Sequence, residues 1–169
     1  MMHFKLRWVV ALWFAALCVP TLVAAQPTEI GTSPQLAIQT LDGKTFNLAA
    51  ERGKWVIVNF WATWCSPCLA EMPAISKYVA AHKNVTAIGL AYQPEDIDVV
   101  RKFARKHKVD YPLAWIDVRR PPAGWAMPAG LPMSYLVAPD GRVVKKFVGP
   151  VDAKLLDAAI AATGKAGQG

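Results

Sequence analysis

Apolar and polar positions alternate in blocks along most of the chain, and each block has the length of one strand or one helix. Residues 55–60 form a short run rich in β-branched and aromatic residues, which is typical of a strand buried on both faces. Residues 66–82 instead place apolar side chains three and four positions apart, as one stripe of an amphipathic helix requires. Pro73 lies inside this segment, so the pattern predicts a helix with a kink.

The other elements follow from the same periodicities and from turn residues. Asp42-Gly43 and Asp140-Gly141 each separate apolar segments and predict two tight hairpins. Strands alternate with helices, which predicts an α/β fold with a central mixed sheet, flanking helices and an added N-terminal β-hairpin. The predicted elements are the hairpin over 36–48, strands at 85–92, 113–116, 133–137 and 142–148, a helix over 94–108, a loop over 117–130, and a last helix that is capped by Asp152 and ends near Gly164.

The first 25 residues have the layout of a secretory signal peptide. Lys5 and Arg7 precede an uncharged apolar run, and small residues follow at 23–25. An uncleaved membrane anchor is the alternative, because the run approaches the roughly 18–20 residues that span a bilayer. Cys18 raises the question of a lipid anchor, for which Leu17 is a poor match. We therefore expect a signal peptide or anchor over 1–25, a linker over 26–34, one domain over 35–164 and a flexible tail over 165–169.

Charge and composition narrow the classes of function. The formal net charge is +7, and loss of Lys5 and Arg7 with the signal peptide would leave +5. The densest basic group lies on the helix predicted over 94–108, where its spacing predicts a solvated face. Nucleic-acid binding needs a recognisable reading motif as well, and we find none. Weak attraction to an acidic partner or an anionic membrane surface stays open.

Cys65 and Cys68 carry the candidate chemistry. They follow a buried strand and open a helix, where unpaired backbone N–H groups and the helix dipole favour negative charge. This position would lower the pKa of Cys65, and Cys68 could then resolve a mixed disulfide formed at Cys65. A structural staple is a weak alternative, because so short a loop constrains little of the unfolded chain. Zinc would need two further ligands, and His82 has no second histidine at a suitable spacing.

The residues around the cysteines resemble a known family. The run Phe60-Trp61-Ala62-Thr63-Trp64-Cys65-Ser66-Pro67-Cys68 and the following Glu71-Met72-Pro73 are similar to the TlpA/ResA-type extracytoplasmic thioredoxins. The resemblance extends from about residue 34 to residue 160. It implies a thioredoxin-like fold, a thiol–disulfide oxidoreductase and a redox-active disulfide with no metal and no other cofactor.

Other site residues are implied by this resemblance. The segment 131–137 matches the stretch that carries the family's cis-proline, which implies a cis Leu131–Pro132 bond facing Cys65 and a backbone that pairs with substrate. The alternative is a proline that merely opens an edge strand. Trp64 and Pro67 are the further substrate-binding candidates.

Glu71 is the third catalytic candidate, implied as an acid/base for Cys68. The alternative is an exposed first-turn glutamate that merely suits the helix dipole. Cytoplasmic thioredoxins carry an aspartate where this chain has Asn59, and an amide cannot take over proton transfer. Glu71 is therefore the available carboxylate.

Tryptophans mark the surroundings. We expect Trp61 and Trp64 to form an apolar surface around Cys65, and Trp55 to pack in the core. Trp115 and Trp125 bracket the loop over 117–130, which forms either a substrate-facing lip or a solvent loop pinned by the two rings.

The resemblance implies a periplasmic or extracytoplasmic enzyme, with inner-membrane anchoring as an option. It would reduce disulfides in exported proteins, in cytochrome c maturation or at cysteines that later bind copper. A membrane thiol relay would supply electrons, and we expect a monomer. Two rivals stay open: an oxidase that inserts disulfides, and a non-catalytic chaperone or copper-binding module that uses the cysteines as ligands.

Overall fold

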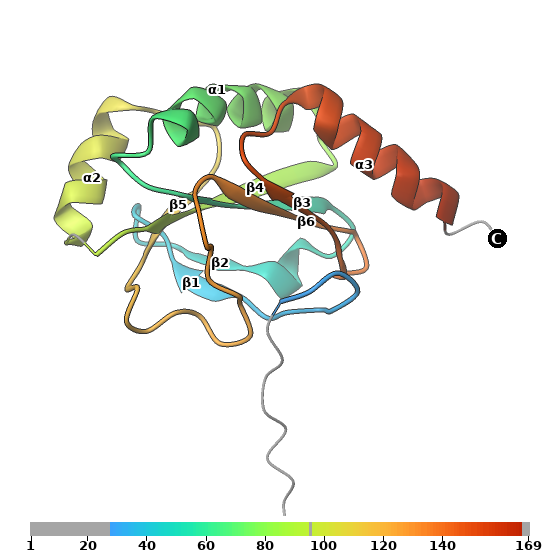
Figure 1. The fold of residues 1–169 in the computed structure, drawn as a ribbon, viewed down its shortest axis with the longest axis horizontal. Coiled ribbons are helices and arrows are strands. Elements are labelled where there is room, and N and C mark those ends of the chain that lie inside the picture. The colour runs from blue at the N-terminus through green and yellow to red at the C-terminus, as the bar shows by residue number, and fades with distance from the viewer. Residues whose placement is uncertain (1–27, 95, 167–169) are drawn as a thin grey trace, which may run out of the picture.

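The computed structural model describes residues 28–94 and 96–166, and side chains up to Thr163. Figure 1 shows a central sheet with helices over one face and a small hairpin below the other. The elements in chain order are β1 (Ala37–Gln39), β2 (Thr45–Asn47), the short 3₁₀ helix η1 (Leu48–Glu51), β3 (Trp55–Trp61), α1 (Ser66–Ala81), β4 (Val85–Tyr92), α2 (Ile97–Lys106), β5 (Leu113–Ile116), β6 (Met133–Val137), β7 (Val143–Val148) and α3 (Ala153–Ala166).

The main sheet has the strand order β5-β4-β3-β6-β7. The central strand β3 pairs in parallel with β4 and antiparallel with β6, and β6 pairs antiparallel with the edge strand β7. β1 and β2 form a separate antiparallel hairpin, in which Gly43 supplies the positive φ of the turn. This is the mixed sheet with flanking helices and an N-terminal hairpin that the sequence predicts.

Each face of the sheet has its own hydrophobic cluster, because successive side chains of β3 point to opposite faces. Ile57 and Trp61 pack with α1, α2 and α3, whereas Val58 and Phe60 pack on the side of the hairpin. Every residue of β3 is buried, as the apolar run predicts for a strand covered on both faces. The alternation also turns Asn59 towards the helices.

Two helix boundaries differ from the sequence-based prediction. α2 begins at Ile97 rather than near residue 94, because the Asp96 side chain caps it by accepting from the Asp98 N–H at 3.0 Å. The Asp152 side chain caps α3 as predicted, accepting from the Leu155 N–H at 2.8 Å. α3 continues past Gly164 to Ala166, because one glycine costs a helix only about 1 kcal/mol. No helix in the described part of the chain is long and apolar enough to cross a membrane.

The N-terminal segment needs a correction over its described part. We predicted a linker over 26–34, yet residues 28–32 are bonded to the domain. The Gly31 N–H donates to the Val143 carbonyl at 2.7 Å, and the Val143 N–H donates to the Thr32 carbonyl at 2.8 Å. The Thr28 side chain is buried and donates to the Gly124 carbonyl at 2.5 Å. The predicted signal peptide or anchor over 1–25 lies outside the described residues.

Candidate active site

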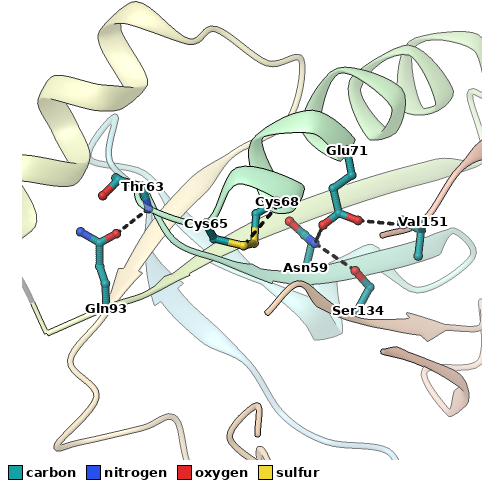
Figure 2. The surroundings of a disulfide bond; sticks show 8 residues. All are labelled: Asn59, Thr63, Cys65, Cys68, Glu71, Gln93, Ser134 and Val151. Carbon is teal, nitrogen blue, oxygen red and sulfur yellow. Dashed lines mark hydrogen bonds between the residues drawn. A yellow bond between two sulfur atoms is a disulfide. The ribbon is translucent and has the colours of Figure 1, made fainter. Parts of the chain in front are cut away.

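Cys65 and Cys68 lie where β3 leads into α1, and they form a disulfide in this structure (Figure 2). Cys65 is the N-cap of α1, and its Sγ accepts from the Cys68 backbone N–H at 3.3 Å. Cys68 is fully buried, whereas Cys65 keeps a 5% exposed fraction. Cys65, the less buried of the two cysteines, is therefore also the one whose sulfur accepts from an N–H group at the helix start, where anions are stabilised.

Local sequence explains this geometry. Pro67 lies in the first turn of α1, where a backbone N–H has no partner within the helix and its absence costs nothing. The loop before Cys65 is fixed by Gln93, whose side-chain Oε1 accepts from the Thr63 N–H at 2.8 Å (Figure 2). Gln93 is completely buried directly after β4. Sequence reasoning missed Gln93. The signal that could have identified it is an amide side chain directly after an apolar strand.

Glu71 is buried, with 3% of its surface exposed, although it lies in the first half of a surface helix. One carboxylate oxygen accepts from Asn59 Nδ2 at 2.7 Å, and the other accepts from the Val151 N–H at 2.8 Å. Burial raises the pKa of Glu71, and the two hydrogen bonds oppose this shift only in part. The alternative of an exposed first-turn glutamate is therefore wrong.

Asn59 and Ser134 complete a small polar cluster beneath α1. Asn59 Nδ2 also donates to Ser134 Oγ at 3.0 Å, and both side chains are fully buried. They lie opposite each other on the paired strands β3 and β6. Sequence reasoning treated Asn59 only as the absence of an aspartate and did not single out Ser134 or Val151. For Asn59 and Ser134, the available signal was a polar residue inside an apolar strand.

The Leu131–Pro132 bond is cis, as the resemblance implies. Pro132 is buried and Leu131 is partly exposed. β6 begins at the next residue, Met133, which pairs with Phe60 near the end of β3. Pro132 therefore lies at the same end of the strands as the loop that carries Cys65. The Pro132 carbonyl accepts from the Gly149 N–H at 2.9 Å, which connects this bend to the end of β7.

The tryptophans divide into surface and core. Trp64 has 60% of its surface exposed next to Cys65, and Pro67 is exposed as well. Trp61 corrects the sequence-based prediction, because it is completely buried and its ring packs 5.3 Å from that of Phe103. Trp55 packs in the core, as expected.

Trp125 pins the loop over 117–130 to the body of the domain. Its ring is buried against Phe60 and Tyr135, and its Nε1 donates to the Gln35 carbonyl at 2.8 Å. Trp115 is half-buried at the other end of the loop. We expected either a substrate-facing lip or a solvent loop pinned by the two rings, and the contacts of Trp125 match the pinned loop.

The chain is similar in sequence to known thiol–disulfide oxidoreductases. The sequence model of the AhpC/TSA family matches residues 31–147. The thiol–disulfide oxidoreductase ResA of a Bacillus cereus strain is 32% identical over 118 residues, which cover 69% of this chain and 68% of the relative. ResA of Bacillus subtilis (strain 168) is 27% identical over 133 residues, covering 76% of this chain and 72% of the relative.

Solved structures show the same fold. The crystal structure of a thiol:disulfide interchange protein, a thioredoxin family protein from Chlorobium tepidum TLS, matches with a TM-score of 0.64 at 26% identity. The match covers 80% of this chain and 97% of that chain. The chain therefore belongs to the AhpC/TSA family and is a thioredoxin-like thiol–disulfide oxidoreductase of the ResA type.

Proposed function

We propose that this protein is an extracytoplasmic disulfide reductase that works through the Cys65/Cys68 dithiol. One observation carries the proposal: Cys65 Sγ caps α1, accepts from the Cys68 N–H at 3.3 Å and is bonded to the buried Cys68. An N–H donor at a helix start stabilises a thiolate, and the thiolate is the nucleophile in thiol–disulfide exchange.

The proposed reaction begins with the dithiol enzyme. The Cys65 thiolate attacks a substrate disulfide, forms a mixed disulfide and releases one substrate sulfur as a thiolate. Cys68 then loses its proton and attacks Cys65, which releases the second substrate sulfur and leaves the Cys65–Cys68 disulfide. Two electrons pass from the enzyme to the substrate, and the substrate sulfurs gain two protons, one lost by Cys68 and one from solvent, which took up the Cys65 proton when the thiolate formed.

Glu71 is the proposed acid/base for Cys68. It lies three residues after Cys68 on α1, and residues at this spacing are neighbours on a helix surface. Burial raises the pKa of Glu71 towards neutral pH. A carboxyl group with such a pKa can take up and return a proton during turnover. Its two hydrogen bonds fix the carboxylate below the helix.

The proposed docking surface for substrate surrounds Cys65. Trp64 and Pro67 are exposed on one side of it. The cis-Pro132 bend lies at the same edge of the sheet, and the backbone of Leu131 is the proposed partner for an extended substrate segment.

Substrates, donor and location follow from the resemblance to ResA-type proteins. We propose exported proteins as substrates, either in cytochrome c maturation or at cysteines that later bind copper. A membrane thiol relay is the proposed electron donor, and the proposed location is periplasmic or otherwise extracytoplasmic, with anchoring to the inner membrane as an option. The proposed enzyme is a monomer and needs no cofactor beyond the Cys65–Cys68 disulfide.

Replacement of the nucleophile tests the enzyme activity. We expect Cys65→Ser to reduce turnover of a disulfide substrate to the uncatalysed rate, because a serine hydroxyl cannot form the mixed disulfide. The measurement is thiol release from an oxidised peptide, with the thermal midpoint as a control for folding. Full turnover by a folded Cys65→Ser variant would contradict the proposal.

The reduction potential tests the direction of electron flow. We expect a value near that of thioredoxin, roughly −270 mV, by redox titration with thiol trapping. A value near roughly −120 mV would place the protein among the strong oxidants and would favour a disulfide-inserting oxidase instead.

A further inference from the structure

The amide of Asn59 lies between the disulfide and the buried carboxylate in Figure 2. Alternation along β3 turns this side chain to the helix-covered face, on which Ile57 and Trp61 also pack. Its hydrogen bond to Glu71 places it directly beneath the first turns of α1. The amide is completely buried, so protein groups have to satisfy each of its polar atoms.

Hydrogen bonds fix which way the amide is turned. Nδ2 donates one hydrogen to Glu71 and the other to Ser134. With Glu71 ionised, the reversed orientation would place Oδ1 against a carboxylate oxygen, and two acceptors do not bond. Oδ1 therefore points away from Glu71. Among the described residues it is a buried acceptor with no hydrogen-bond partner.

The free acceptor points towards the redox centre. Figure 2 shows the Asn59 oxygen turned towards the Cys65–Cys68 disulfide. Cys68 precedes Glu71 by three residues on α1, which puts their Cβ atoms about 5–6 Å apart. Cys68 is also fully buried, so its sulfur is shielded from solvent. The disulfide carries no hydrogen on Cys68 Sγ, whereas the reduced thiol has one to donate.

We propose that, in the reduced enzyme, the Cys68 thiol donates a hydrogen bond to Asn59 Oδ1. Asn59 would thus hold the Cys68 thiol while its Nδ2 holds Glu71, and one buried amide would contact both groups that exchange a proton. The inference deepens the proposed function and rests on it for its catalytic meaning.

The proposed bond has two consequences. An acceptor for the S–H group favours the protonated form of Cys68, so the thiolate of the reduced pair is located at Cys65, where the helix start stabilises it. The bond also satisfies the Asn59 acceptor only after reduction. It therefore stabilises the dithiol relative to the disulfide and makes the enzyme a weaker reductant than a site without this oxygen.

The side-chain carbonyl carbon of Asn59 reports the bond directly. Hydrogen bonding to an amide oxygen moves the carbon resonance of that carbonyl downfield, and the chain has only three asparagines to resolve. We would record the Asn59 ¹³Cγ resonance in the reduced full-length protein, in Cys68→Ala and in Cys65→Ala, at a pH well below the ordinary thiol pKa. Asn47 and Asn84 are exposed and serve as internal references.

We expect the Asn59 resonance to move upfield in reduced Cys68→Ala, to keep its wild-type position in reduced Cys65→Ala, and to return downfield in Cys68→Ser, whose hydroxyl is again a donor. An unchanged resonance in Cys68→Ala overturns the proposal. An equal shift in Cys65→Ala overturns it as well, because Cys65 would then be the donor.

These outcomes are independent of turnover. If the protein shows the expected shifts but reduces no disulfide, the Asn59 bond is supported and the proposed function is contradicted. If the protein reduces disulfides but the shifts are absent, the proposed function is supported and the Asn59 bond is contradicted.

Discussion

Glu71 shows how a single side chain balances opposing forces. Removal of its carboxylate from water favours the neutral acid, whereas the donors from Asn59 and Val151 favour the charged form. Burial dominates, and the pKa of Glu71 is raised. Burial of the Tyr111 hydroxyl, and after it the charge of Glu71, raise the pKa of Tyr111. The charge of Glu71 therefore affects the titration of a neighbouring side chain.

The raised pKa of Glu71 predicts a pH dependence of stability. Between the ordinary glutamate pKa and the raised one, the folded state binds more protons than the unfolded state. The contribution of Glu71 is thus most favourable below the ordinary pKa and is lost as pH rises through the raised value. We expect the free energy of unfolding of wild type minus that of Glu71→Gln to fall across this range.

Urea unfolding of both oxidised proteins from acidic to neutral pH measures this difference. Glu51→Gln is the matched control for a Glu→Gln change, because it removes a half-buried carboxylate paired to Lys54 and far from the cysteines in the sequence. A wild-type minus Glu71→Gln difference that is flat or rises with pH would contradict the raised pKa.

At the scale of elements, the polar cluster beneath α1 lies beside a tightly packed point of the sheet, at Gly89 of β4. Gly89 of β4 lies between Asn59 of β3 and Leu113 of β5 in the sheet register. A Cβ at this position would lie 2.5 Å from Leu113 Cδ2, 3.1 Å from Trp61 Nε1 and 3.2 Å from Tyr111 Cε2. The sheet therefore leaves no room for any side chain beside the polar cluster.

We expect Gly89→Ala to destabilise the protein by about 1–3 kcal/mol, because overpacking a filled core forces side chains off their preferred rotamers. Chemical denaturation measures the loss. Gly130→Ala is the control, since a Cβ there meets no atom within 4 Å and should change stability by less than about 0.5 kcal/mol. Equal stability of the two variants would show that the core adapts.

At the scale of the whole molecule, the N-terminal segment and the loop over 117–130 cover the face of the sheet opposite the cysteine helix. Figure 1 shows the loop, in orange, on the same side of the sheet as β1 and β2. Trp125 connects these parts, because its ring packs on β3 and β6 while its Nε1 bonds the Gln35 carbonyl. Thr28 adds a second bond between the two segments, to Gly124.

Trp125→Ala should therefore cost about 3–5 kcal/mol of stability, as expected when a large buried ring is removed. Trp64→Ala is the matched control, because Trp64 is 60% exposed and its loss should change stability by about 0.5 kcal/mol or less. Thermal or urea unfolding of both variants measures the contrast. Similar stability of the two would mean that Trp125 does not hold the loop.

The sequence by itself determined the elements and the redox pair. Strand and helix periods act over a few residues, so β3, α1 and β4 could be predicted within a residue or two. The cysteine spacing and its place after a buried strand were equally local. The cis Leu131–Pro132 bond was predicted through the family resemblance, since a proline alone indicates cis only about one time in twenty.

Only the tertiary structure decided which polar residues join the cysteines. Glu71, Asn59, Ser134 and the Val151 N–H come from four segments, and their contact depends on strand register and on the packing of α1. The burial of Trp61 and the docking of residues 28–32 likewise depend on groups distant in sequence. Local patterns indicate which face a side chain takes, whereas its partners are set by which segments fold against that face.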